Sequence, residues 1–289
     1  MKIGIIGYGV VGGATGEMLK RNHRIIAYDK YKKPHNLEIQ LERIAREAEV
    51  VFVCVPTPMK PSGEIDYTPI HDSLKALRDK LTDQAGETTD ILVVIRSTAV
   101  SGTSDDLALQ YGLRIAVNPE FLTEKNAKED MENTDHVVLG ANDQKSLETL
   151  EQVYRPIFPN AKYIHVNRRT AEMIKYAANV MLALQIGGAN ELFGICEAFG
   201  VDYQTVAGAI LLDPRIGRNI QVPGHDGDRG FGGKCLPKDL NALIYKAREA
   251  MYRPYLLEEL WRLNERIREN RDWENIAGAT SGSLHKNEE

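Results

Sequence analysis

The sequence predicts an α/β protein whose N-terminal part forms a doubly wound parallel sheet, followed by a region built from helices alone. Two observations lead to this prediction. Short β-branched runs alternate with amphipathic stretches as far as residue 140, as in repeated strand–helix units. After residue 166 the strand signals end and a long stretch without proline follows. We therefore expect a sheet domain at 1–166, a helical domain at 167–275 and a disordered tail at 276–289.

In the first domain, apolar runs with strand character precede helical stretches with the 3.6-residue period of an amphipathic helix. The expected strands are Lys2–Gly7, Arg24–Tyr28, Val50–Val55, Ile91–Ile95, Arg114–Val117 and His136–Leu139. The expected helices are Val10–Arg21, Ile39–Glu47, Thr68–Leu81 and Ser101–Gln110. The first, third and fourth strands are apolar almost throughout, which is typical of parallel strands covered on both faces.

In the second domain the main feature is a helix predicted over Thr170–Phe199, whose length at 1.5 Å per residue would be about 45 Å. Three shorter helices are expected at Tyr203–Ala209, Pro237–Ala250 and Pro254–Asn270. A loop rich in Gly, Pro and Asp separates the first two of these three. Because so small a domain cannot bury such a long helix, we expect the helix to pair with its mate in a homodimer. A helix half covered by its own sheet domain is the alternative.

The charge and cysteine content restrict the class of protein. Lys plus Arg number 36 and Asp plus Glu 41 among 289 residues, a net charge of −5, which argues against nucleic acid or an anionic membrane as the main partner. No apolar stretch approaches the length needed to cross a bilayer. Three cysteines are too few for a disulfide framework. Since the N-terminus runs directly into a strand pattern without a secretory signal, we expect a cytoplasmic protein with free thiols.

A dinucleotide-binding pattern occupies the end of the first strand. Gly7, Gly9 and Gly12 allow a tight turn and a close approach of the backbone to a pyrophosphate, and Val10 and Val11 open the helix whose N–H groups bind phosphate. Asp29 ends the second strand, where its carboxylate can bind the adenosine ribose and disfavour a 2′-phosphate. The pattern indicates a Rossmann-type domain that binds NAD. The alternative for Asp29 is that it only caps a turn.

A second pattern, Gly230–Leu240, surrounds Cys235 with glycines, lysines and a proline. A thiol at a helix N-terminus beside Lys234 and Lys238 should have a lowered pKa, which suits a nucleophile. The other two cysteines, Cys54 in an apolar strand and Cys196 on the long helix, are interpreted as small buried apolar residues.

Several stretches together resemble the UDP-glucose 6-dehydrogenase family, within the wider UDP-glucose/GDP-mannose dehydrogenase group. They follow the family's order from residue 1 to about 270. The matching stretches are Gly7–Gly12, Val53–Pro58, Ser97-Thr98, Asn118–Leu122, Glu172–Asn179, Asp213–Gly217 and Gly230–Leu240.

The resemblance implies two successive reductions of NAD, in which a sugar C6 alcohol becomes a carboxylate. Lys175 and Asn179 would stabilise the alkoxide, and Asp239 with an ordered water would help to remove the C6 proton. Cys235 would attack the aldehyde to give a thiohemiacetal and then a thioester, with Glu120 as acid and base.

The resemblance also implies binding roles for further residues. The backbone at Phe121, Leu122 and Gly232 and the guanidinium of Arg215 would hold sugar or phosphate, together with Lys175 and Asn179. Thr57, Thr98 and Glu124 would line the nicotinamide side, although Thr57 has the alternative of only shaping a turn. The motif Asn118-Pro119-Glu120 favours a neutral hexose, so UDP-glucose is the expected substrate.

The chain departs from the family in two respects that bear on function. Family members continue into a third domain that closes over the nucleotide base, and we expect this chain to lack that domain or to receive it from a separate chain. Residues 225–229 form a longer insert than usual, and its His225, Asp226 and Asp228 are interpreted as a hydrated turn, with no metal expected. Three readings follow: a working enzyme, a non-catalytic NAD-binding partner or half of a split enzyme, and a piece of a longer enzyme.

Overall fold

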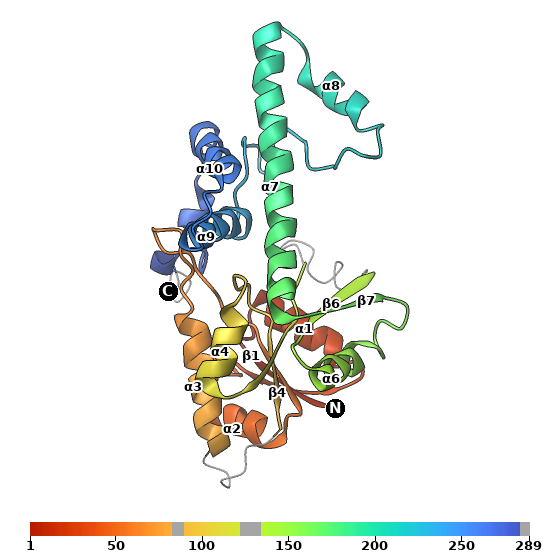
Figure 1. Ribbon diagram of the computed structural model, residues 1–289, viewed down its shortest axis with the longest axis vertical. Coiled ribbons are helices and arrows are strands. Elements are labelled where there is room, and N and C mark those ends of the chain that lie inside the picture. Colours follow the sequence, from red (N-terminus) through yellow and green to blue (C-terminus); the bar gives the residue numbers. More distant parts are fainter. Residues whose placement is uncertain (83–89, 122–133, 284–289) are drawn as a thin grey trace. The chain divides into compact units, whose positions relative to one another are not determined.

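The computed structural model describes residues 1–82, 90–121 and 134–283. The chain forms two compact units (Figure 1). Unit 1 comprises Met1–Thr57 and Tyr67–Lys175, and unit 2 comprises Pro58–Asp66 and Tyr176–Glu289.

Unit 1 is built around a sheet to which the described residues contribute seven strands, in the order β2-β1-β3-β4-β5-β6-β7. Neighbouring strands are parallel except β5 and β6, which pair antiparallel through Val117 and Gly140. The reversal of order at β1 and β3 is the mark of a doubly wound sheet. The strands are β1 Lys2–Ile6, β2 Arg24–Tyr28, β3 Val50–Val53, β4 Leu92–Ile95, β5 Arg114–Val117, β6 His136–Gly140 and β7 Lys162–Val166.

Helices cover both faces of this sheet, because successive side chains on a buried strand point to opposite faces. Val50 and Phe52 pack in one apolar cluster with residues of α1 and α6, whereas Val51 and Val53 pack in another with residues of α2, α3 and α4. The helices are α1 Val10–Leu19, α2 Glu38–Glu47, α3 Thr68–Thr82, α4 Thr103–Tyr111 and α6 Gln144–Tyr154.

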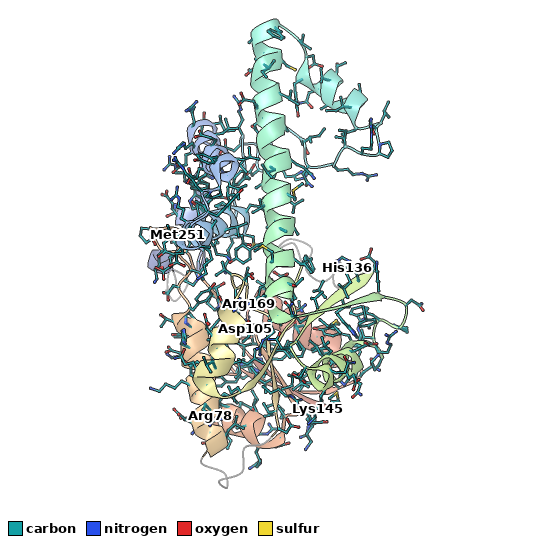
Figure 2. All side chains as sticks on the ribbon, in the orientation of Figure 1. Arg78, Asp105, His136, Lys145, Arg169 and Met251 are labelled. Atoms are coloured by element: carbon teal, nitrogen blue, oxygen red, sulfur yellow. The ribbon has the colours of Figure 1, made fainter. Side chains whose placement is uncertain are left out.

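The first turns of α7, Arg168–Phe199, dock on α4 within unit 1. Arg168 and Arg169 pair with Asp105 at 2.7 and 2.6 Å, and Figure 2 shows Asp105 and Arg169 lying together. Glu172 accepts the backbone N–H groups of Gly102 and Ser104 at 2.7 and 2.8 Å, so it caps the N-terminus of α4. These contacts fix the start of the helix that carries Lys175.

In unit 2, α9 (Leu236–Glu249) and α10 (Tyr255–Ile267) pack on the middle of α7 through a cluster that includes Ala183, Leu240 and Leu260. Gly187 lets α10 approach closely, since a Cβ there would lie 2.2 Å from Leu260 Cδ1. α8, Tyr203–Ile210, packs on the later part of α7 through a separate cluster. Figure 1 shows α8 beside the C-terminal end of α7.

The structure confirms the expected sheet, its six predicted strands and the single long helix. It adds β7 and α6, whose patterns between residues 140 and 166 had not been assigned. No helix in the described ranges is long and apolar enough to span a membrane.

The division of the chain differs from the expected boundary after residue 166. The division falls within α7, between Lys175 and Tyr176, because the first turns of this helix pack on α4. Pro58–Asp66 also belongs to unit 2. There Met59 pairs with Thr280 and packs against Trp273.

The tail expected to be disordered from residue 276 is structured as far as residue 283, where the 3-10 helix η2, Ser281–Ser283, ends the described chain. Met59 donates its N–H to Ala279 O and accepts the N–H of Ser281, both at 2.9 Å. Ala279 is only 1 % exposed. The small, polar composition of the tail gave no sign of this pairing, which joins residues far apart in sequence.

Candidate active site

The turn between β1 and α1 has the features needed to bind a diphosphate. Gly7 has a φ of +88°, and a Cβ on Gly12 would lie 1.9 Å from Gly7 O, so both positions require glycine. Gly9 faces open space and caps α1 without a side chain, and the first turn of α1 holds no acidic residue. The N–H groups at the start of α1 are therefore open to an anionic ligand.

Asp29 follows β2, beside this turn. Its carboxylate accepts the N–H groups of Tyr8 at 2.6 Å and of Tyr31 and Lys32 at 3.0 Å. Asp29 thus caps this turn. A carboxylate has more lone pairs than these three bonds use, and the turn holds it next to the glycine loop, where it can also accept a ribose hydroxyl.

Glu120 lies just after β5 on a loop that buried polar contacts hold in place. Asn118 donates to Val138 O at 2.8 Å and accepts from the guanidinium of Arg96, whose Nε also donates to Thr15 Oγ1 at 2.9 Å. Both Asn118 and Arg96 are buried. Arg96, which follows β4 directly and fixes the neighbouring strand end, was not among the predicted site residues.

Lys175 and Glu120 are brought together in unit 1, with 3.6 Å between Nζ and Oε1, and both side chains are buried. The ammonium also lies 5.6 Å from the centre of the Phe121 ring. A small cavity of about 10 Å³, the size of one water molecule, adjoins this pair. Its polar lining includes Thr98 and Glu172. A buried ammonium, a carboxylate and room for one water are suited to proton transfer.

Glu172 is the second carboxyl group in the lining of this cavity, and it was not among the predicted site residues. Burial raises its pKa to about 7, although the hydrogen bonds from Ser104 and Gly102 act in the opposite direction and lower it. A buried carboxyl group that titrates near neutral pH makes the stability of unit 1 depend on pH.

Glu172→Gln is expected to remove part of this pH dependence. Because the folded-state pKa of Glu172 is raised from 4.5 to about 7, the folded chain binds more protons than the unfolded chain between these values. The free energy of unfolding should then fall by about 3 kcal/mol as the pH rises from 4.5 to 8. The variant should lack this fall, whereas the exposed control Glu148→Gln should keep it. Denaturant unfolding at several pH values measures the difference, and equal slopes in all three proteins would contradict the prediction.

In unit 2, Cys235 is the N-cap residue of α9, which confirms its expected place at a helix N-terminus, and Pro237 lies in the first turn. The positive end of the helix dipole favours a thiolate at this position. The other cysteines differ from it. Burial raises the pKa of the Cys54 thiol to about 12, and Cys196 packs in the apolar cluster around Tyr203.

Asp239 lies in the first turn of α9 and is only 1 % exposed. It accepts a hydrogen bond of 2.5 Å from Asn179 Nδ2 and forms an ion pair with Lys238, which is also buried. The structure therefore joins Asn179 of α7 to Asp239 of α9. The partnership of Lys238 with Asp239 had not been predicted.

The remaining predicted site residues lie in different parts of the chain. Thr57 is buried and ends the first segment of unit 1. Arg215 follows α8, and its side chain is 86 % exposed. It forms an ion pair with Asp213 at 2.5 Å. Gly232 lies in the loop before Cys235. Leu122 and Glu124 lie outside the described residues.

The doubly wound sheet, with a glycine turn between β1 and α1 and an acidic residue after β2, defines an NAD-binding protein of the Rossmann type. Comparison with known proteins makes this assignment more specific. The NAD-binding domain of the UDP-glucose/GDP-mannose dehydrogenase family matches residues 29–158, and the central domain of the same family matches residues 169–266. The chain belongs to this family.

Individual relatives agree with the family. A UDP-glucose 6-dehydrogenase of Bacillus subtilis is 35 % identical over 237 residues, which are 79 % of this chain and 51 % of the relative. A UDP-glucose 6-dehydrogenase of Rickettsia felis is 35 % identical over 220 residues, covering 74 % and 46 %. The solved UDP-glucose dehydrogenase of Pyrobaculum islandicum has 28 % identity and a TM-score of 0.78, covering 92 % of this chain and 68 % of that one. The chain spans about half the length of the curated relatives it matches.

Proposed function

We propose that this chain is an NAD-dependent nucleotide-sugar 6-dehydrogenase that converts UDP-glucose to UDP-glucuronate through a thioester on Cys235. The proposal is carried by the position of Cys235 at the N-terminus of α9, one turn before the buried Asp239–Asn179 pair. The relatives named UDP-glucose 6-dehydrogenase support the choice of sugar and nucleotide.

NAD, when bound, accepts a hydride in each of two oxidations. The backbone at Gly7, Gly9 and Gly12 would hold its pyrophosphate, and Asp29 would hold its ribose. Thr57 and Thr98 follow β3 and β4 at the carboxyl edge of the sheet, where the nicotinamide of such a cofactor lies.

In the first oxidation the C6 alcohol loses a hydride from carbon and a proton from oxygen. We assign the stabilisation of the developing alkoxide to Lys175 and Asn179, and the removal of the proton to Asp239 acting through a water. The ion pair with Lys238 and the hydrogen bond from Asn179 hold the Asp239 carboxylate in place.

In the second oxidation the Cys235 thiolate adds to the C6 aldehyde and forms a C–S bond, giving a thiohemiacetal. Loss of a hydride from C6 and of a proton from its hydroxyl leaves a thioester. Water then adds to the thioester carbon, the C–S bond breaks, and the carboxylate and the thiol are released. Glu120, held at 3.6 Å from Lys175, is assigned the proton transfers of these steps.

The match to the family's NAD-binding domain is also compatible with a second function. In this alternative the chain binds NAD as a non-catalytic partner, or as one half of a split enzyme completed by a separate chain. Steady-state NADH formation at 340 nm with UDP-glucose and GDP-mannose, without any added protein, separates the two functions. Turnover supports the enzyme, whereas NAD binding without turnover supports the alternative.

We further propose a homodimer formed through the later part of α7. Leu192, Ile195 and Phe199 on this helix are exposed, as are Leu211 and Leu212 after α8. Such a cluster of exposed apolar side chains is typical of an interface. Arg215 follows the same segment and is exposed, and we propose that in the dimer it binds the sugar of the second copy.

Mixing two inactive variants tests this arrangement. Cys235→Ala and Arg215→Ala are each expected to abolish carboxylate formation, which is the activity followed here. If Arg215 acts on the second copy, co-expression in equal amounts should restore about a quarter of the wild-type activity, since half of the dimers would hold one intact site. Activity assays on the co-purified mixture provide the measurement. A mixture as inactive as either variant alone would place Arg215 in the site of its own chain or remove it from the site.

A further inference from the structure

The loop Gly230–Gly233, which precedes Cys235, is held by side chains from two helices of unit 2. Asn264 of α10 accepts the N–H of Phe231 at 2.7 Å and donates to Phe231 O at 3.0 Å. Asn190 of α7 accepts the N–H of Gly230 at 3.1 Å. Gly230 and Gly233 both have positive φ, of +69° and +75°. Because glycine loses more conformational freedom on folding than other residues, such a loop needs these contacts to keep one conformation.

A third contact lies next to the nucleophile. Asp272 accepts the N–H of Gly233 with both carboxylate oxygens at 3.1 Å, and one of these oxygens lies 3.4 Å from Arg268 Nη2. Arg268 and Asp272 pack directly on Gly232, where a Cβ would lie 2.1 Å from Arg268 Nη2. Gly232 therefore needs to be glycine for this packing as well as for its predicted contact with the sugar.

The side chain of Arg268 is only 1 % exposed. Arginine is rarely buried to this degree unless its charge is paired. Its guanidinium pairs with Asp226 at 2.6 Å and donates to Asn270 O at 2.8 Å and Arg229 O at 3.3 Å. Asp228 lies 3.9 Å away and also accepts the N–H of Asn270 at 2.8 Å. The longer insert at 225–229 thus supplies two of the three carboxylates around Arg268.

We propose that Arg268 and Asp272 are positioning residues that set the orientation of the Gly232–Gly233 backbone and, through it, the place of the Cys235 thiol at the N-terminus of α9. The role assigned to Cys235 rests on the proposed function. A nucleophile must be held close to its productive geometry by neighbours that are themselves fixed. Burial and the carboxylate partners fix Arg268. Arg268 in turn fixes Asp272, and Asp272 fixes the N–H of Gly233.

The test measures the reactivity of the Cys235 thiol on the whole chain without NAD or sugar, so it remains readable if the chain does not turn over. Iodoacetamide labelling across pH 6–10, followed at the Cys235 peptide by mass spectrometry, gives the midpoint of the reactivity profile. The variants are Arg268→Met and Asp272→Ala. Glu259→Ala, which removes an exposed carboxylate from α10, is the matched control.

A positioning role and a simple charge effect predict different shifts of the midpoint for these two variants. If the residues acted only through their charges, loss of a cation and loss of an anion would move the midpoint in opposite directions. If they position the thiol, both variants should move it upward, toward about 8.5 for a free thiol, with Glu259→Ala unchanged. Shifts in opposite directions, or no shift in either variant, would overturn the proposal.

A measurement on the wild-type protein covers the case in which a variant does not fold. The amide hydrogens of Phe231 and Gly233 should exchange at least about 100-fold more slowly than in an unstructured peptide, because Phe231 is bound to the buried Asn264 and Gly233 to the half-buried Asp272. Exchange at the rate of an unstructured peptide would show that the loop is not held and would refute the positioning role. The isosteric Asp272→Asn, which keeps an oxygen acceptor for Gly233, should shift the midpoint less than Asp272→Ala.

Discussion

Replacing Cys235 by alanine is expected to lower the rate of carboxylate formation by at least about 10³-fold, because the thioester route loses its nucleophile. The first oxidation, from alcohol to aldehyde, does not use the thiol and should continue slowly. NAD binding should be unchanged, since the glycine turn lies in unit 1. Product analysis by mass spectrometry, with NAD affinity measured in parallel, checks both expectations.

Cys196→Ala is the matched control for this substitution, because Cys196 lies on α7 in the same unit and packs in an apolar cluster. It should leave turnover within about twofold of wild type. Carboxylate formation that survives in Cys235→Ala would exclude a covalent route through this residue. Equal losses in both cysteine variants would point to general damage to unit 2.

The second large effect is expected at Asp239. Asp239→Asn removes the charge that balances Lys238, and both side chains are buried. Leaving one buried partner of an ion pair alone costs about 3–5 kcal/mol, so the variant should unfold at clearly lower denaturant concentration. Turnover should fall as well, since an amide cannot act as a base. Denaturant unfolding and NADH formation measure the two effects.

A double variant separates stability from catalysis at this pair. Lys238→Met combined with Asp239→Asn removes both charges and keeps a similar volume, so most of the lost stability should return. Activity should remain as low as in Asp239→Asn. If activity returned together with stability, the role of Asp239 would be to balance Lys238, and a different group would have to take the C6 proton.

Local patterns in the sequence were sufficient for the parts of the fold that depend on neighbouring residues. The glycine turn and the start of α9 at Cys235 could be predicted because their glycines and proline set backbone conformation within a few residues. The long helix α7 could be predicted from its uninterrupted helical composition, and its glycine at 187 is explained by the close approach of α10.

Features that depend on distant residues could not be predicted in this way. Arg96 and Arg268 are isolated charged residues in the sequence, and only the folded chain shows that they are buried and hold the loops before Glu120 and Cys235. The pairing of Met59 with residues 279–281 joins segments about 220 residues apart and gives the end of the described chain a structure that its composition did not indicate. Lys238 was expected only to lie near the sulfur, but its contact is with Asp239.

The number of NADH molecules formed per sugar tests the central claim most directly. A limiting amount of UDP-glucose, consumed to completion with excess NAD, should yield two NADH and one UDP-glucuronate for each sugar. A thioester at Cys235, trapped by acid quenching and found on its peptide by mass spectrometry, should accompany turnover. One NADH per sugar with a released aldehyde, or no NADH while NAD still binds, would contradict the account.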